Sequence, residues 1–179
     1  LTKSLGEDYI LQNDYNYLVI RVASVFGLCG NNFVKTIMKL LLEREEVRVI
    51  KDQKISMTSS FDVAKNIYKI INLYNRNSVQ KERKKIIHLT NKGYTNWYSV
   101  AKIVKDEMEK NLKSEINSKI IPIKSNEWLA KATRPKDSRL KVDFKYLESA
   151  NIHLPYWEQS VRYIVKNILK NESIGFAKR

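Results

Sequence analysis

The sequence predicts an α/β fold, because short apolar runs alternate along the chain with longer segments whose apolar residues recur at helical spacing. Turn residues bound the apolar runs, as is typical of buried parallel strands. The chain has 179 residues, 43% of them hydrophobic, which suffices for the core of one domain of ordinary size. It contains no internal repeat and no low-complexity linker.

The first predicted elements are a helix, a strand and a second helix. Residues 2–12 indicate the end of a helix, and the polar turn 13–16 separates it from an apolar run at 17–22 that predicts a buried strand. Asn31 or Asn32 can cap the next helix, because an amide oxygen accepts a hydrogen bond from a free N–H of the first turn. The apolar positions of that helix are Phe33, Ile37, Leu40 and Leu41.

The rest of the chain continues the alternation. Strands are predicted at 47–50, 86–89 and 120–123, the last at a sheet edge because Pro122 has no N–H to donate. The segment 52–60 is polar, and we expect it to be irregular. Helices are predicted at 61–73, at 97 to about 110 after Thr95 and Asn96, at 144–149 after a capping Asp143, and from Pro155 to about Lys170.

Charge and cysteine content limit the classes of function. The formal net charge is +14, which raises nucleic acid as a partner, but the basic residues are spread along the chain and the densest run, Lys81–Lys85, contains an acid. Because Cys29 is the single cysteine, no intrachain disulfide can form, and no apolar window is long enough to cross a membrane. A cytoplasmic location is therefore expected. His88, His153 and Cys29 lack metal-ligand spacing, and we expect His88 to be a buried structural residue.

Six short motifs follow one another along nearly the whole chain. They are R-V-A-S-V-F-G-L-C-G-N-N-F at 21–33, D-Q-K-I-S-M-T at 52–58, F-D-V-A at 61–64, I-H-L-T-N-K-G at 87–93 with Trp97 and Tyr98 after it, A-T-R-P-K-D-S at 132–138, and L-P-Y-W at 154–157. In this order they resemble the motifs of the dTDP-4-dehydrorhamnose reductases, which are extended short-chain dehydrogenases with a Rossmann core.

Four positions depart from the family's motifs. Ser24 stands where the family has tryptophan, and Asp137 where it has asparagine. Ile55 and Met57 replace a glycine and a proline of the second motif. These changes leave the fold prediction intact but bear on substrate contacts.

The resemblance implies the C-terminal part of a Rossmann-like parallel sheet plus a small α/β substrate-binding subdomain, with the N-terminal strands missing. Residues 1–46 and 60–91 would be remnants of the Rossmann core. Residues 47–59 and 92–179 would mainly form the substrate-binding part.

The start of the chain resembles the end of the family's catalytic motif, Tyr-x-x-x-Lys followed by Gly-Glu, because residues 2–7 read T-K-S-L-G-E. Lys3 would then be the catalytic lysine, which binds the nicotinamide ribose and lowers the pKa of the tyrosine. The tyrosine and the Gly-rich dinucleotide-binding turn would precede Leu1. We therefore expect the 179 residues to be inactive alone, whereas the complete enzyme would use NADPH to convert dTDP-4-dehydro-6-deoxy-L-mannose to dTDP-L-rhamnose for cell-surface polysaccharide.

The family resemblance also implies where cofactor and substrate would lie. Ser24 and Val25 follow a parallel strand at its carboxyl end and would lie beside the nicotinamide together with Lys3. Asn32 and Phe33 would lie beside the substrate nucleotide.

Thr58 would face the nucleotide from a loop, and Arg134 would bind a phosphate through its planar guanidinium. Structural roles stay open at each of these positions: capping for Asn32 and Thr58, core packing for Phe33, and an ion pair for Arg134. Trp97 and Trp157 begin helices, and we expect both to be core anchors.

Two other classes of function stay open. One is a non-catalytic relic or regulatory protein of the same superfamily, such as the regulatory β subunit of methionine adenosyltransferase. The other is a basic nucleic-acid-binding module. The partners that the resemblance implies are a dTDP-sugar and either an N-terminal fragment or a second copy in a homodimer.

Overall fold

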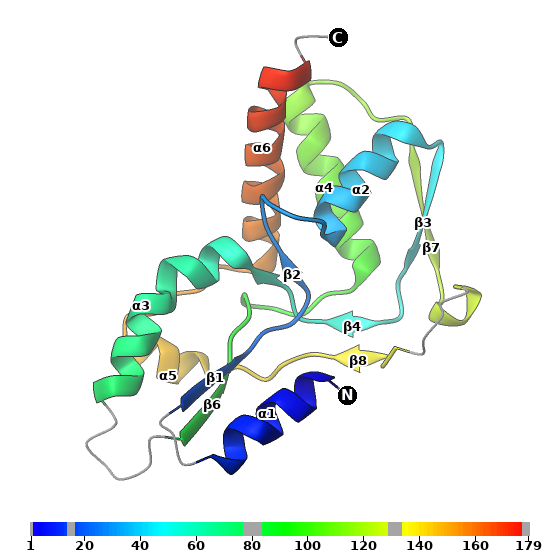
Figure 1. Ribbon diagram of the computed structural model, residues 1–179. Helices are drawn as coiled ribbons and strands as arrows, with labels where there is room; N and C mark the ends of the chain where they lie inside the picture. Colours follow the sequence, from blue (N-terminus) through cyan, green and yellow to red (C-terminus); the bar gives the residue numbers. More distant parts are fainter. Residues whose placement is uncertain (1, 14–16, 77–83, 129–133, 177–179) are drawn as a thin grey trace.

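The computed structural model describes residues 2–13, 17–76, 84–128 and 134–176, and its helices and strands alternate along the chain (Figure 1). The helices are α1 (Thr2–Gln12), α2 (Phe33–Glu43), α3 (Ser60–Arg76), α4 (Trp97–Leu112), the 3₁₀ turn η2 (Ser125–Glu127), α5 (Phe144–Ser149) and α6 (Trp157–Phe176). The strands are β1 (Tyr17–Arg21), β2 (Val25–Phe26), β3 (Glu46–Ile50), β4 (Lys54–Ile55), β5 (Thr58–Ser59), β6 (Lys84–His88), β7 (Lys119–Ile123) and β8 (Asp137–Ser138). The predicted α/β class is confirmed.

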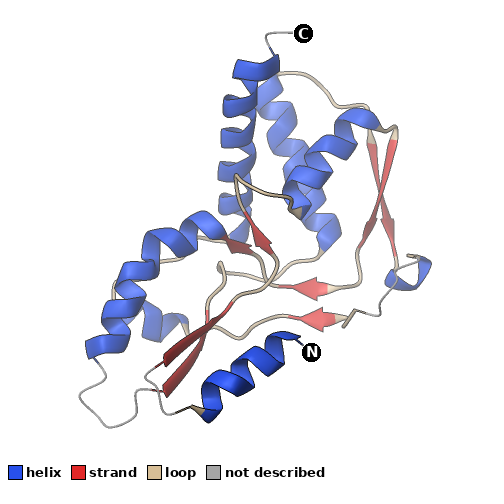
Figure 2. Ribbon diagram, viewed as in Figure 1, coloured by secondary structure: helices blue, strands red, loops and turns tan. Residues whose placement is uncertain are grey.

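The strands pair in parallel, as the strand–helix alternation predicts. Within the described residues each sheet has two strands, in the pairs β1–β6, β2–β5, β3–β7 and β4–β8 (Figure 2). Val49 lies opposite Pro122 in the β3–β7 pair, so the proline lies in an edge strand as predicted. β1 and β3 therefore each have their partner far along the chain, and this brings distant segments together.

The larger apolar core lies between α2, α4, α6 and β3. Figure 1 shows α4 and α6 side by side, with α2 next to α4. The apolar residues of each helix recur at intervals of three and four, so they form one buried stripe. The stripes consist of Val34, Ile37, Met38 and Leu41 on α2, Val100, Val104 and Met108 on α4, and Val161, Ile164, Val165 and Ile168 on α6.

A second, smaller core lies where α3 and α5 meet the β1–β6 pair. Its buried residues are Ile70, Leu89, Leu147, Ile152 and Leu154. Thus the chain builds two apolar clusters, and Ile55 and Met57, which lie between β3 and α3, belong to the larger one.

A buried polar network ties α3 and α6 to the loop after β6. The Asn91 amide donates hydrogen bonds to a carboxylate oxygen of Asp62 and to the hydroxyl of Ser160, both at 2.8 Å. Ser160 in turn donates to Asp62 at 2.6 Å, and the Asn91 side-chain oxygen accepts from the backbone N–H of Ser59 at 2.8 Å. Because each of these groups has a partner, the network joins three segments without leaving one of its own polar groups unsatisfied.

The predicted helix caps at Asn32 and Asp143 are confirmed, and Asn96 caps α4 in the same way. Asn32, Asn96 and Asp143 each precede the first helical residue, and their side-chain oxygens accept from the backbone N–H of Lys35, Ser99 and Tyr146 respectively. These caps fix where α2, α4 and α5 begin.

The prediction for residues 52–60 was wrong in part. The segment contains β4 and β5, and Gln53, Ser56 and Thr58 are buried in spite of their polarity. The polar side chains are tolerated because they bond to neighbouring segments; the Ser56 hydroxyl, for example, accepts from the Leu140 N–H at 3.0 Å. The very short strand β8, which pairs with β4, was also not predicted.

The histidine and tryptophan predictions have mixed outcomes. Trp157 is 5% exposed and is a core anchor, as predicted, whereas Trp97 is only half-buried. His88 is also half-buried, and its Nδ1 lies 3.0 Å from the Lys141 carbonyl oxygen, which is a structural contact. The predicted turn at 14–16 and most of the basic run Lys81–Lys85 lie outside the described residues.

Candidate functional site

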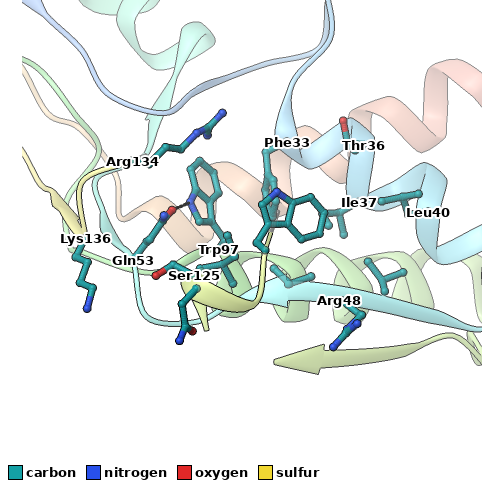
Figure 3. Close-up of a pocket in the computed structure, with 15 residues that line it drawn as sticks. Phe33, Thr36, Ile37, Leu40, Arg48, Gln53, Trp97, Ser125, Arg134 and Lys136 are labelled. Carbon is teal, nitrogen blue, oxygen red and sulfur yellow. Dashed lines mark hydrogen bonds between the residues drawn. The ribbon is translucent and has the colours of Figure 1, made fainter. Parts of the chain in front are cut away.

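A pocket of about 740 Å³ opens between the first turns of α2, strand β3 and the turn η2 (Figure 3). Segments that are far apart in the sequence meet there because β3 pairs with β7, which leads into η2. The pocket is lined by Phe33, Thr36, Ile37, Leu40, Val47, Arg48, Val49, Ile50, Gln53, Trp97, Ser125, Asn126, Trp128, Arg134 and Lys136.

Aromatic side chains form a large part of the pocket. The Phe33 and Trp97 rings lie with their centroids 4.6 Å apart at an interplanar angle of 50°. The Trp97 indole N–H donates to the Gln53 side-chain oxygen at 3.1 Å, so the orientation of its ring is fixed (Figure 3). Trp128 is 52% exposed and adds a further aromatic face. These faces are suited to a flat ring.

The charges of the pocket are all positive. Arg48, Arg134 and Lys136 line it, and none of the described residues that line it is acidic. Figure 3 shows Arg134 and Lys136 on the side where Gln53 lies, and Arg48 near Leu40. Cations beside aromatic faces favour a ligand that carries both a flat ring and negative charge, such as a nucleotide.

The predicted substrate residues Phe33 and Arg134 both line this pocket. The side chain of Asn32, the residue directly before Phe33, bonds to other parts of the protein. Its amide donates to the Gly27 carbonyl at 2.9 Å, and its oxygen caps α2. Asn32 thereby joins the glycine-containing loop to the start of α2, and this fixes the position of Phe33.

Thr58 is 1% exposed and holds the loop after β1. Its hydroxyl donates to the Ala23 carbonyl at 2.6 Å and accepts from the Ala23 N–H at 3.2 Å. Its own N–H donates to the carbonyl of Ser24 at 3.3 Å. Ser24 has φ +44°, a left-handed conformation that few residues other than glycine adopt, so these bonds hold a strained position.

Val25 and Lys3 lie away from the pocket lining. Val25, in β2, is 50% exposed at the carboxyl side of β1. Lys3 lies in the first turn of α1, a helix with no buried residue. An ion pair between Glu7 and Arg21, 2.6 Å between carboxylate and guanidinium, fastens α1 to β1. The hydrogen bond from Arg21 holds the pKa of Glu7 below its ordinary value.

A Tyr-x-x-x-Lys spacing does occur within the chain, on α4, at Tyr98 and Lys102. The Lys102 ammonium lies 5.8 Å from the centre of the Tyr98 ring, and neither residue lines the pocket. Among the described residues no group of three His, Cys, Asp or Glu side chains could hold a metal ion, and Cys29 is exposed. In the same part of the chain, no helix has the length and apolar character needed to cross a membrane.

Sequence reasoning missed several residues of the pocket. Arg48, Gln53, Trp128 and Lys136 were not predicted as site residues, and Trp97 was predicted to be only a core anchor. A usable signal was present: Gln53 lies in the second motif, Trp97 follows the fourth, and Lys136 is two residues from Arg134. Trp128 belongs to no motif, and only the chain fold brings it to the pocket.

Comparison with known proteins gives a consistent result. The RmlD substrate binding domain family matches residues 1–170. The dTDP-4-dehydrorhamnose reductase of Sinorhizobium fredii is 30% identical over 168 residues, which cover 94% of this chain and 55% of that protein. A spore coat polysaccharide biosynthesis protein of Bacillus subtilis is 29% identical over 161 residues, which cover 90% of this chain and 51% of that protein.

Among solved structures, the dTDP-4-dehydrorhamnose reductase of Bacillus anthracis in complex with NADP is similar, with a TM-score of 0.72 and 28% sequence identity. The match covers 91% of this chain and 53% of that one. The chain therefore spans about half the length of the relatives that it matches.

Proposed function

The chain belongs to the RmlD substrate binding domain family, and on this premise we propose that it binds the sugar nucleotide in the NADPH-dependent reduction of dTDP-4-dehydro-6-deoxy-L-mannose to dTDP-L-rhamnose. The observation that carries the proposal is the pocket beside β3, which combines aromatic faces with three cations. A dTDP-sugar presents a flat base and a diphosphate, and these are the two features that such a pocket complements. The product would serve cell-surface polysaccharide, and the location would be the cytoplasm.

The pocket residues divide into three groups by chemistry. Trp97, Trp128 and Phe33 supply apolar faces for the base. Arg48, Arg134 and Lys136 neutralise the diphosphate, with Arg134 able to form two parallel hydrogen bonds to one phosphate. Asn32 and Thr58 contribute indirectly, because they hold the loop and the helix start from which Phe33 projects.

The nicotinamide cofactor would lie at the carboxyl end of β1. Val25 is half exposed there and offers an apolar face for a flat ring, and Ser24 lies next to it. When bound, NADPH supplies the hydride. By resemblance to the family, Lys3 would bind the nicotinamide ribose, and the tyrosine that protonates the alkoxide would come from upstream of Leu1.

These residue roles lead to a proposal for which parts of the chain form which part of the fold. Residues 47–59 and 92–179 would mainly form the substrate-binding part, and 1–46 and 60–91 would belong to the nucleotide-binding core. α2 lies within residues 1–46, yet its first residue lines the pocket and its apolar stripe packs against α4 and α6 of the proposed substrate-binding part. Exposed apolar residues of α1, such as Leu5 and Tyr9, would contact an N-terminal segment or a second copy.

Calorimetric titration of the chain with dTDP tests the binding proposal. We expect saturable binding that Arg134→Met weakens about tenfold, since a hydrogen bond to a charged group contributes about 1.5–3 kcal/mol. Arg139→Met is the matched control, because Arg139 pairs with Asp137 outside the pocket and should leave the affinity for dTDP unchanged. Equal loss in both variants, or no binding by the wild-type chain, would contradict the proposal.

Two further measurements separate the alternatives. The 179 residues mixed with NADPH and the ketosugar should leave the 340 nm absorbance constant, and NADPH oxidation would overturn the expected inactivity. Binding to DNA that falls steeply with added salt would favour the nucleic-acid module instead.

A further inference from the structure

The connection between β3 and β4, residues 51–53, contacts two parts of the pocket lining at once, the turn η2 and Trp97. The Asp52 carboxylate accepts two hydrogen bonds from Ser125, one from its N–H at 2.8 Å and one from its hydroxyl at 2.9 Å. The next residue, Gln53, is 6% exposed and accepts from the Trp97 indole N–H at 3.1 Å. Two consecutive side chains therefore hold the turn η2 on one side and Trp97 on the other.

The backbone of this connection is itself fixed. The N–H of Lys51 donates to the Ile123 carbonyl at 2.9 Å. This bond continues the β3–β7 pairing by one residue beyond the end of β3. Asp52 and Gln53 therefore start from a rigid position. A rigid anchor is what a side chain needs to fix the position of another group.

Trp128 directly follows η2, a turn of only three residues. The bonds within the turn are local: the Glu127 side chain accepts from the Lys124 N–H at 2.7 Å, the Glu127 N–H donates to the Lys124 carbonyl at 3.0 Å, and the Trp128 N–H donates to the Ser125 carbonyl at 3.4 Å. So short a turn has little intrinsic stability. The β3–β7 pairing leads into the turn, and the two bonds from Ser125 to Asp52 then hold the turn against the β3–β4 connection, directly before Trp128.

We propose that Asp52 and Gln53 are positioning residues for the nucleotide base, with Asp52 acting through Trp128 and Gln53 acting through Trp97. The inference rests on the proposed function, because it assumes that a nucleotide occupies the pocket. Asp52 and Gln53 set the separation of the Trp97 and Trp128 indoles. A flat base binds well only when this separation and the orientation of the two rings match it.

The charge state of Asp52 agrees with this role. Desolvation raises the pKa of its carboxyl, but the hydrogen bonds from the Ser125 hydroxyl and N–H lower it, and the net pKa is below the ordinary value. The carboxyl is therefore ionised at neutral pH, and both of its oxygens accept.

A double-mutant cycle on the 179-residue chain tests the inference, with dTDP as the probe and calorimetry as the readout. Trp128→Ala should weaken dTDP binding about 5- to 50-fold, as expected for the loss of one base–aromatic stack. Asp52→Ala should weaken it about 3- to 10-fold, because the turn loses both of its anchors. If Asp52 acts through Trp128, the double variant binds dTDP within twofold of Trp128→Ala alone.

The same design applies to the second pair. Gln53→Met removes the acceptor and Trp97→Phe removes the donor, while both keep the size of the side chain roughly constant. The double variant should bind dTDP no more weakly than the weaker of the two single variants.

Asp143→Ala is the matched control for Asp52→Ala. Asp143 also caps a short helix, accepting from the Tyr146 N–H at 3.0 Å, but α5 lies outside the pocket lining. This variant should lose stability yet keep its dTDP affinity within twofold. If Asp52→Ala fails to fold, Asp52→Asn replaces it, because this variant keeps one acceptor oxygen. It should lose less affinity for dTDP, and it should cause no further loss when Trp128 is already alanine.

The outcomes are distinguishable. If the wild-type chain does not bind dTDP, the proposed function fails and the inference fails with it. If it binds but the losses at Asp52 and Trp128 are additive, or Asp52→Ala keeps full affinity, the positioning role is wrong while the binding function stands.

Discussion

Replacing Thr58 by valine removes one hydroxyl with almost no change of shape. The hydroxyl makes two hydrogen bonds to Ala23, one as donor to the carbonyl and one as acceptor from the N–H. Thr58 is 1% exposed and Ala23 is half-buried, so valine leaves both backbone groups of Ala23 without this partner. Losing a buried partner costs about 1–3 kcal/mol, so we expect Thr58→Val to lower the free energy of unfolding by about 2 kcal/mol.

Thermal unfolding followed by circular dichroism measures this effect. For a chain of this length 1 kcal/mol corresponds to about 2–4 °C, so the expected decrease in Tm is about 4–8 °C. Thr58→Ser keeps the hydroxyl and loses one methyl, and it should recover about half of the loss. Thr36→Val is the matched control: the Thr36 hydroxyl donates to the Asn32 carbonyl at 3.0 Å but is exposed, so its removal should cost about 0.5 kcal/mol or less.

The result also separates a positioning role from a direct contact. If Thr58 holds the Ser24 loop, Thr58→Val lowers Tm and weakens dTDP binding, and Thr58→Ser recovers about half of the decrease in Tm and restores dTDP binding. If Thr58→Val is as stable as Thr36→Val, the hydrogen bonds to Ala23 do not hold the loop, and the reasoning from burial is refuted.

Two further predictions concern close packing and acid stability. Gly27→Ala would bring the new Cβ too close to the Ser60 hydroxyl, so we expect the free energy of unfolding in urea to fall by about 1–3 kcal/mol. Adding Ser60→Ala should recover this loss, and an equal loss in the double variant would contradict the contact. Hydrogen bonds from Arg139 lower the pKa of Asp137 from 3.8 to about 2, so the pair stabilises the fold above about pH 4 and this contribution is lost as the pH falls toward 2. Asp137→Asn should therefore flatten the stability profile between those pH values and change little at neutral pH, because the pair is exposed; identical acid profiles for both proteins would disprove it.

Local features of the fold could be predicted from the sequence because their causes are local. The caps at Asn32, Asn96 and Asp143 depend on a side chain and an N–H three residues later, and the motif at 21–33 contains both the strand end and the cap. Phe33 and Arg134 came from the family resemblance, and the pocket brings them together.

The rest of the site depends on long-range pairing. Trp128 reaches the pocket only because β7 pairs with β3, some seventy residues earlier in the chain, and no local pattern specifies that partner. Gln53 lies in a polar segment for which irregular structure was predicted, whereas the residue is buried and its amide oxygen bonds to Trp97. Hydropathy alone cannot distinguish a polar residue in water from one with a buried partner.

The departures from the family motifs bear on whether the chain is a decayed relic. Ile55 and Met57, at the positions of a glycine and a proline, are 2% and 1% exposed and belong to the larger core. Ile55 also exchanges two backbone hydrogen bonds with Thr95 in an isolated bridge, and it is not among the described residues with positive φ, so its backbone needs no glycine.

Asp137 departs in a different way, since it is exposed but forms hydrogen bonds and an ion pair with Arg139, whose guanidinium lies 5.1 Å from the Tyr94 ring centre. Random decay would leave cavities or unpaired polar groups at such positions, and these carry costs of a few kcal/mol each. Each of these three replacements instead fills its space or has its own partner. Three of the four departures from the family motifs are therefore accommodated by packing or hydrogen bonding within this fold.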